Sequence, residues 1–173
     1  MGFPPQGSGI SNALQLVQTV TVGIASTSIT FNNLDINTDK RYFLETFVNN
    51  QQANTNYYIF VNNDTTLGNY FKTSLSADFG VSAVSSTNTP EFIFGSQIDD
   101  RFYGELRIVL GDDGKMRCYN QLYRDVFIPN PGIWVSSIIC TDVLANITRL
   151  DITGSNANAI GIGSFFRLYR VKP

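Results

Sequence analysis

Short segments in which apolar and polar residues alternate recur along most of the chain, separated by clusters of Gly, Asn, Asp, Ser and Thr. Alternation with a period of two is typical of a β-strand with one buried face, and β-branched and aromatic residues favour the same structure. The pattern predicts strands over residues 14–22, 28–31, 41–48, 57–61, 69–75, 92–94, 102–110, 115–123, 134–140, 147–152 and 162–171. No segment has the periodicity of an amphipathic helix. The Ser- and Thr-rich residues 77–90 are expected to form mainly a loop.

The clearest hairpin joins residues 102–110 to residues 115–123. Alternation in the first strand places apolar residues such as Leu106 on one face and polar residues such as Glu105 on the other. The connecting Gly-Asp-Asp-Gly sequence, residues 111–114, supplies residues that tolerate a positive φ angle. These features predict two antiparallel strands joined by a tight turn.

Regularly spaced strands without helical crossovers predict an all-β fold, an antiparallel two-sheet β-sandwich of about ten strands that is jelly-roll-like. The chain of 173 residues is long enough to bury a core of its own. We expect residues 14–173 to form a single sandwich domain. Residues 1–13 are rich in Gly and Pro and have no periodicity, so they are predicted to be a flexible N-terminal arm.

Composition excludes several classes of function. The chain contains no histidine, whereas Ser-His-Asp and Cys-His catalysis require an imidazole and catalytic zinc sites usually do. Hydrolysis by two carboxylates needs no histidine and stays open as a minor alternative. A net charge of −2 and a pI near 4.9 give no attraction to nucleic acid or an anionic membrane. We therefore expect no enzymatic activity, no cofactor and no metal.

Acidic motifs are predicted to be structural. Residues 35–39 have the D-x-N-x-D opening of a calcium loop, but Lys40 replaces the glycine and Thr46 the final glutamate. This segment is expected to be an Asx-rich turn between strands. The pairs at residues 99–100 and 112–113 are neighbouring acids in turns, so they are expected to face solvent rather than to form a catalytic pair.

The two cysteines, Cys118 and Cys140, have no metal-binding spacing. The simplest interpretation is two buried, reduced thiols. A disulfide between them depends on geometry that the sequence does not contain.

Five aromatic residues allow two interpretations, namely Tyr57, Tyr58, Tyr119, Tyr123 and Trp134. On a solvent-facing surface they would form a platform for sugar rings, centred on Trp134 with Tyr57 or Tyr58. In the sandwich core or at a subunit interface they would provide packing, because Tyr and Trp are enriched at both places. We favour the second interpretation.

The C-terminal segment, residues 161–172, reads Gly-Ile-Gly-Ser-Phe-Phe-Arg-Leu-Tyr-Arg-Val-Lys. It resembles a recurrent ending of virion proteins of tailed bacteriophages, in which a Gly-Ser step leads into a last strand of the form aromatic-x-Leu-Tyr-Gly. Gly163-Ser164 and Leu168-Tyr169 match, and Arg170 stands where Gly is usual. The step Gly-Ile-Trp at residues 132–134 is also similar to that family.

The resemblance implies a small β-sandwich module without enzymatic activity: a capsid decoration, head-fibre or tail component. Its location would be the virion, after synthesis in the host cytoplasm. Expected partners are further copies of the chain, in a homotrimer, and other virion proteins such as the major capsid protein. The alternative function is a carbohydrate-binding module that recognises a glycan of the host surface.

The arm is expected to be the attachment element. Phe3 and Ile10 are apolar residues with no evident place in the sandwich, and Pro4-Pro5 prevents the arm from folding by itself. Such a segment can become ordered on a partner by adding to a sheet edge or filling a groove. The alternative is an ordinary frayed terminus.

Overall fold

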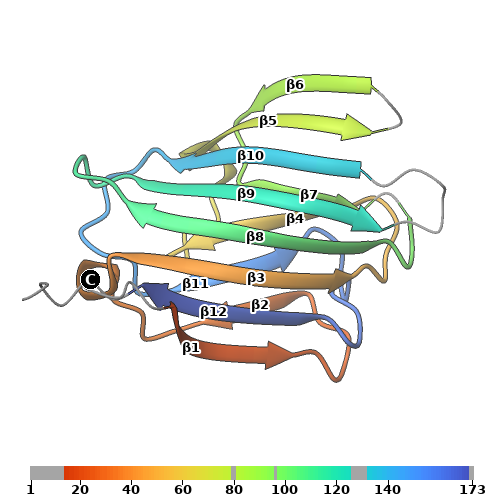
Figure 1. The fold of residues 1–173 in the computed structure, drawn as a ribbon, viewed down its shortest axis with the longest axis horizontal. Helices are drawn as coiled ribbons and strands as arrows, with labels where there is room; N and C mark the ends of the chain where they lie inside the picture. Colours follow the sequence, from red (N-terminus) through yellow and green to blue (C-terminus); the bar gives the residue numbers. More distant parts are fainter. Residues whose placement is uncertain (1–13, 79–80, 96, 126–131, 172–173) are drawn as a thin grey trace, which may run out of the picture.

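The computed structural model describes residues 14–78, 81–95, 97–125 and 132–171. Within these ranges the chain forms twelve strands, a single turn of α-helix and a short 3-10 helix (Figure 1). The elements are β1 (Leu14–Thr21), β2 (Ser28–Phe31), α1 (Ile36–Asp39), β3 (Arg41–Asn49), β4 (Thr55–Val61), η1 (Leu67–Asn69), β5 (Tyr70–Asp78), β6 (Val81–Thr87), β7 (Glu91–Gly95), β8 (Arg101–Leu110), β9 (Met116–Asp125), β10 (Gly132–Cys140), β11 (Leu150–Gly154) and β12 (Phe165–Val171).

Two antiparallel sheets pack face to face. The larger sheet has eight strands in the order β1-β12-β3-β8-β9-β10-β5-β6, and the smaller has four in the order β2-β11-β4-β7. The predicted all-β sandwich is therefore confirmed. Every predicted strand is present, and the hairpin of β8 and β9 pairs Arg101 with Asp125 through to Leu110 with Met116.

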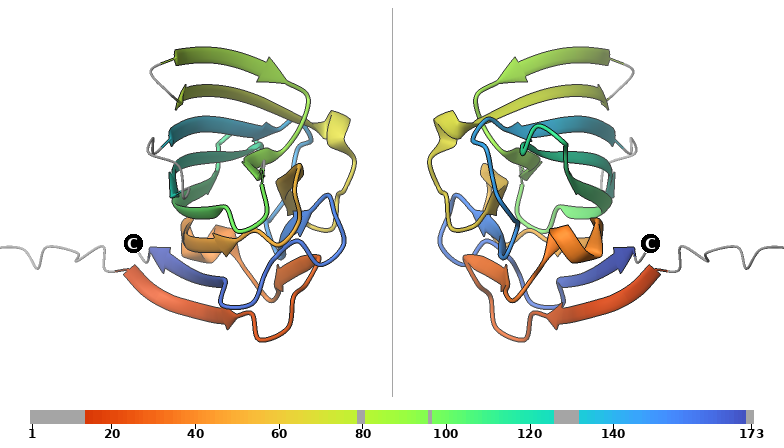
Figure 2. Two further views of the ribbon diagram at one scale, coloured as in Figure 1. Left: turned by 90° about the vertical axis from the view of Figure 1, so that its right-hand side faces the viewer. Right: turned by 90° about the vertical axis from the view of Figure 1, so that its left-hand side faces the viewer.

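Eight of the strands wind between the two sheets, alternately except that β4 and β7 follow one another in the smaller sheet. Along the chain, β1, β3, β8 and β12 enter the larger sheet, while β2, β4, β7 and β11 form the smaller one. This alternation is the course of a jelly roll. The other four strands, β9, β10, β5 and β6, lie beside one another and extend only the larger sheet. Figures 1 and 2 show β5 and β6 projecting past β7, the edge of the smaller sheet.

One strand, β6, lies inside the segment that the sequence predicted to be mainly a loop. It pairs with β5 from Lys72 opposite Thr87 to Asp78 opposite Val81. A strand at the edge of a sheet obtains its backbone hydrogen bonds from one neighbour and needs no strong apolar alternation of its own. The Ser- and Thr-rich sequence therefore concealed it.

The segment at residues 35–39 also differs from its prediction, because it forms a capped turn of helix. The Asp35 side chain accepts hydrogen bonds from the backbone N of Thr38 (3.4 Å) and from its hydroxyl (2.6 Å). These bonds hold the pKa of Asp35 below its usual value. Lys40 ends the turn with φ at 66°. The carboxylate thus serves as an N-cap, and no cluster of metal-binding side chains occurs in the described ranges.

The core lies between the sheets and is tied to the surrounding loops by three buried tyrosines. The hydroxyl of Tyr42 donates to Asp39 Oδ2 (2.8 Å), and that of Tyr70 donates to the backbone oxygen of Asp64 (2.9 Å). Tyr57 places its hydroxyl 2.7 Å from Asn50 Oδ1. Burial raises the pKa of all three phenols, so each stays a neutral hydrogen-bond donor. The rings fill the core while the hydroxyls fix the loops.

Gly104 on β8 tests how tightly neighbouring strands of the larger sheet pack. A Cβ atom at this position would overlap the side chain of Leu122 and lie 3.0 Å from the backbone oxygen of Gln121. We expect Gly104→Ala to lower the free energy of unfolding by about 1–3 kcal/mol, the usual cost of overpacking. The measurement is the midpoint of urea unfolding. The matched control is Gly68→Ala, where no heavy atom lies within 4 Å, and an equal loss in both variants would contradict the packing argument.

Candidate functional site

The outer face of the larger sheet is the surface that departs furthest from an ordinary sandwich. We use "outer face" for the outward-pointing side chains of β12, β3, β8, β9, β10 and β5. Outward positions of an antiparallel sheet are usually polar. Here seven large aromatic or apolar residues are each 40–50% exposed, namely Phe71, Leu75, Tyr103, Tyr119, Tyr123, Ile133 and Val135.

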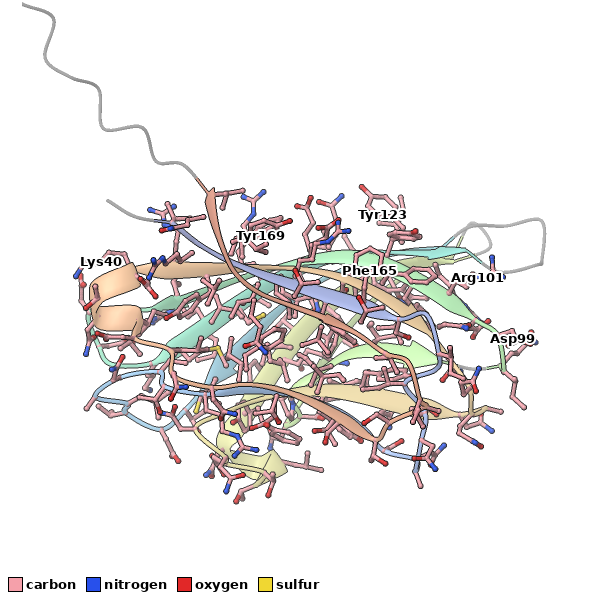
Figure 3. The ribbon with its side chains drawn as sticks, turned by 90° about the horizontal axis from the view of Figure 1, so that it is seen from below. Lys40, Asp99, Arg101, Tyr123, Phe165 and Tyr169 are labelled. Atoms are coloured by element: carbon pink, nitrogen blue, oxygen red, sulfur yellow. The ribbon has the colours of Figure 1, made fainter. Side chains whose placement is uncertain are left out.

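Strand register aligns an aromatic row across the outer face. The aligned residues, in order from β12 to β10, are Phe165, Phe47, Tyr103, Tyr123 and Ile133. Each comes from one of five adjacent strands. Phe47 lies 4.6 Å from Tyr103 and 5.6 Å from Phe165 between ring centroids. Figure 3 shows Tyr123, Phe165 and Tyr169 along one side of the molecule. Three rings of the row, Phe165, Phe47 and Tyr103, are in mutual contact, and Tyr123 and Ile133 continue the row on the next two strands.

A charged row lies beside the aromatic one. It aligns Arg167 with Glu45, Glu105 and Gln121. Arg167 pairs with Glu45 at 3.2 Å and places its guanidinium 4.6 Å from the centre of the Phe165 ring. Glu105 is exposed and, within the described ranges, has no hydrogen-bond or ion-pair partner. It therefore presents a bare carboxylate to the solvent.

A third row combines aromatic rings with a cation. It aligns Tyr169, Phe43, Arg107 and Tyr119. Phe43, Arg107 and Tyr119 border a shallow hollow of about 340 Å³, to which Leu14 at the start of β1 also contributes. Arg107 is exposed and, like Glu105, has no partner among the residues that the structure describes. The outer face thus carries free charges of both signs between its aromatic rows.

The structure divides the five aromatic residues singled out from the sequence. Tyr119 and Tyr123 lie on the outer face, 50% and 47% exposed. Tyr57 is fully buried and Tyr58 is half-buried in the smaller sheet, so neither shares a surface with Trp134. Trp134 packs against the core on the inner side of the larger sheet. The platform centred on Trp134 with Tyr57 or Tyr58 does not form, and Tyr57 occupies the core.

The sequence interpretation missed three members of the aromatic row, namely Phe47, Tyr103 and Phe165. The sequence contains the signal for these residues. Large aromatic side chains stand at alternate positions of β3 and β8, on the face opposite to the core side chains. Only the register between strands shows that these side chains meet in one row.

One acidic pair behaves differently from its prediction. Asp100 was expected to face solvent, but it is 1% exposed and its carboxylate lies 2.8 Å from Arg124 Nη2. It also accepts a hydrogen bond from the backbone N of Gln97 at 2.9 Å. The acid of the tight turn, Asp113, behaves as expected, since it pairs with Arg117 at 2.7 Å. The carboxylates of Asp100 and Asp113 each form an ion pair near the end of a strand, rather than forming a catalytic pair.

Cys118 and Cys140 are both buried free thiols. Burial raises the pKa of Cys118 to about 12 and also raises that of Cys140, so both remain protonated at neutral pH. The simplest interpretation of the sequence is confirmed. In the part of the chain that the structure describes, no helix is long and apolar enough to cross a membrane.

The residues expected to attach the arm, Phe3, Pro4, Pro5 and Ile10, lie outside the described residues. No model of a known protein family matches the chain, and no curated protein matches its sequence. The outer face is therefore interpreted from its own geometry.

The charged row generates a test of local electrostatics. Glu45 and Glu105 are direct cross-strand neighbours, and like charges in that position destabilise a sheet. We expect Glu105→Gln to raise the free energy of unfolding by about 0.5 kcal/mol at low ionic strength, with a smaller gain as salt screens the repulsion. The measurement is urea unfolding of dilute protein at two salt concentrations.

The matched control is Glu45→Gln, which removes the same repulsion but also loses the ion pair with Arg167 and the hydrogen bond from Tyr169 (3.3 Å). It should give no gain. A destabilised Glu105→Gln variant would show that the carboxylate has a stabilising role within the monomer.

Proposed function

We propose that the protein is a non-enzymatic structural component of a tailed-bacteriophage virion, serving as a head decoration, head fibre or tail component. It assembles into a homotrimer through the outer face and attaches to other virion proteins, such as the major capsid protein, through residues 1–13. The resemblance of its last strand to phage virion proteins supports the setting. The geometry of the outer face supports the assembly.

The observation that carries the proposal is the aromatic row of the outer face. Contiguous exposed apolar surface rimmed by polar residues is typical of protein interfaces. Tyr and Phe are enriched there because they bury large areas with little loss of side-chain entropy. A row that runs across five strands offers a flat, rigid surface whose shape does not depend on loops.

The charges of the outer face favour a second copy of the chain as the partner. Glu105 and Arg107 lie two residues apart on β8 and both lack partners in the described structure. Contact between copies can bring the carboxylate of one against the guanidinium of the next. Such pairing fixes orientation and adds specificity to an interface whose affinity comes from the aromatic rings.

The larger sheet also supports attachment through the arm. Leu14 begins β1, which is the edge strand of that sheet. Leu14, the first described residue, therefore lies at an edge next to the outer face. Several weak arms on one oligomer would bind together through their high effective concentration.

A charge on the aromatic row should dissociate the oligomer. We expect Tyr123→Lys to shift the molar mass from trimer to monomer, because an ammonium group would be buried without a partner at the interface. Multi-angle light scattering at micromolar concentrations measures the mass, and circular dichroism checks the fold. Ile24→Lys, at a loop position that is 85% exposed, is the matched control and should leave the mass unchanged. A native protein that is monomeric throughout would refute assembly.

Deletion of residues 1–13 should separate attachment from folding. We expect the truncated chain to keep its fold and its oligomeric mass but to be missing from phage particles. The measurement is its copy number in particles assembled with the truncated protein in place of the full chain. Incorporation at the normal copy number would place attachment on the sandwich instead.

A further inference from the structure

A second surface lies on the inner side of the larger sheet, where the sheet projects past β7. A hollow of about 170 Å³ opens there between β5, β10 and the start of β7. Because one water needs only about 10–15 Å³ measured in this way, the hollow has room for a small molecule. It is separate from the outer face, since side chains of the same strands alternate between the two.

The strand pattern changes at this hollow. The inward side chains of β5 belong to Tyr70, Lys72, Ser74 and Ser76, and the last three of these are polar. The corresponding position of β10 is Ser136. Inward positions of a sandwich normally carry apolar side chains. Polar residues that break this rule together are typical of functional sites.

An ion pair provides the central polar feature of the hollow. Lys72 Nζ lies 2.7 Å from Glu91 Oε1, and the two side chains are only 10% and 22% exposed. An ammonium group has three donors, and Glu91 is the only acceptor that Lys72 reaches in the described structure. Two donors of Lys72 and the second oxygen of Glu91 are therefore without a partner in the described structure and are available to a ligand.

Stability does not account for this ion pair. Removing two charges from water costs several kcal/mol per ion, and well-packed apolar residues of the same volume often stabilise a protein as much or more. A donor and an acceptor held next to each other, in contrast, match two neighbouring hydroxyl groups of a ligand.

Trp134 supplies an aromatic wall to the same hollow. Its ring is tilted at 59° against Phe102, with centroids 6.5 Å apart, and Arg124 lies 5.9 Å from its centre. The indole is therefore held in place by the core but remains only partly buried. A rigid aromatic surface beside polar groups is suited to a ligand that has both C–H faces and hydroxyl groups.

The charge balance of the hollow favours an uncharged ligand. Lys72 and Glu91 neutralise each other, and Arg124, whose guanidinium lies over the indole ring, is neutralised by Asp100 at 2.8 Å. We propose that this hollow binds a single neutral sugar unit. Lys72 and Glu91 hold neighbouring hydroxyl groups, Ser76 bonds a further one, and Trp134 packs against the ring. This site is independent of the assembly function proposed above.

The only tryptophan of the chain is the one that borders the hollow, so its fluorescence reports occupancy directly. The full-length protein is titrated with the methyl glycosides of glucose, galactose, mannose and N-acetylglucosamine. We expect a saturable change in emission with at least one glycoside, with a dissociation constant in the millimolar range. Glycine and alanine, which are zwitterions of comparable size, should give no change.

Variants test the named contacts. Lys72→Met keeps an unbranched chain without the charge and should weaken binding at least tenfold. Ser76→Ala removes one hydroxyl group, has little reason to disturb the fold, and should weaken binding severalfold. Lys115→Met, in the turn between β8 and β9, is the matched control and should bind as the native protein does. The dissociated Tyr123→Lys variant should also retain binding, which separates this site from the assembly proposal.

Three outcomes would overturn the proposal. The first is no saturable change in emission with any glycoside. The second is unchanged affinity in both folded variants, Lys72→Met and Ser76→Ala. The third is a response to the zwitterions without one to the glycosides, which would make the ion pair a site for amino acids.

Discussion

The difference in width between the two sheets is the constraint on which the rest of this structure depends. A β-sheet must bury at least one face, and in this sandwich four strands can cover only part of a sheet of eight. Where the sheets overlap, the core is apolar, with residues such as Leu44, Leu106 and Ile152 fully buried. Where β5 extends past β7, its inward residues become Lys72, Ser74 and Ser76. The width of the smaller sheet thus sets where the apolar core ends and where the polar hollow begins.

The outer face has the opposite property, since it is more apolar than an exposed surface requires. Sheets with large apolar residues on both faces are usually buried on both faces. The larger sheet meets this condition on its inner side through the smaller sheet, and on its outer side it presents Phe47, Tyr103 and Tyr123 to the solvent. A second copy of the chain would complete the pattern, and that need is the basis of the proposed assembly.

The two surfaces use adjacent residues of the same strands. On β10, Trp134 faces the inner hollow while Val135 faces outward. On β9, Arg124 is buried beside Asp100 while Tyr123 is exposed on the outer face. Because strand residues alternate strictly between faces, a rigid sheet can offer an assembly surface on one side and a ligand site on the other. Neither requires a movable loop.

The sequence by itself determined the fold class, the eleven strands with clear apolar character and the hairpin turn, because period-two alternation and turn residues are local signals. It could not reveal β6, whose Ser- and Thr-rich sequence forms a strand only because β5 lies beside it. It could not place Asp100 in a buried pair with Arg124, since the partner is distant in the chain. Register and sheet width decided which aromatic rings share a row and which polar side chains meet in a hollow. These depend on contacts between strands far apart in sequence, and only the tertiary structure fixes them.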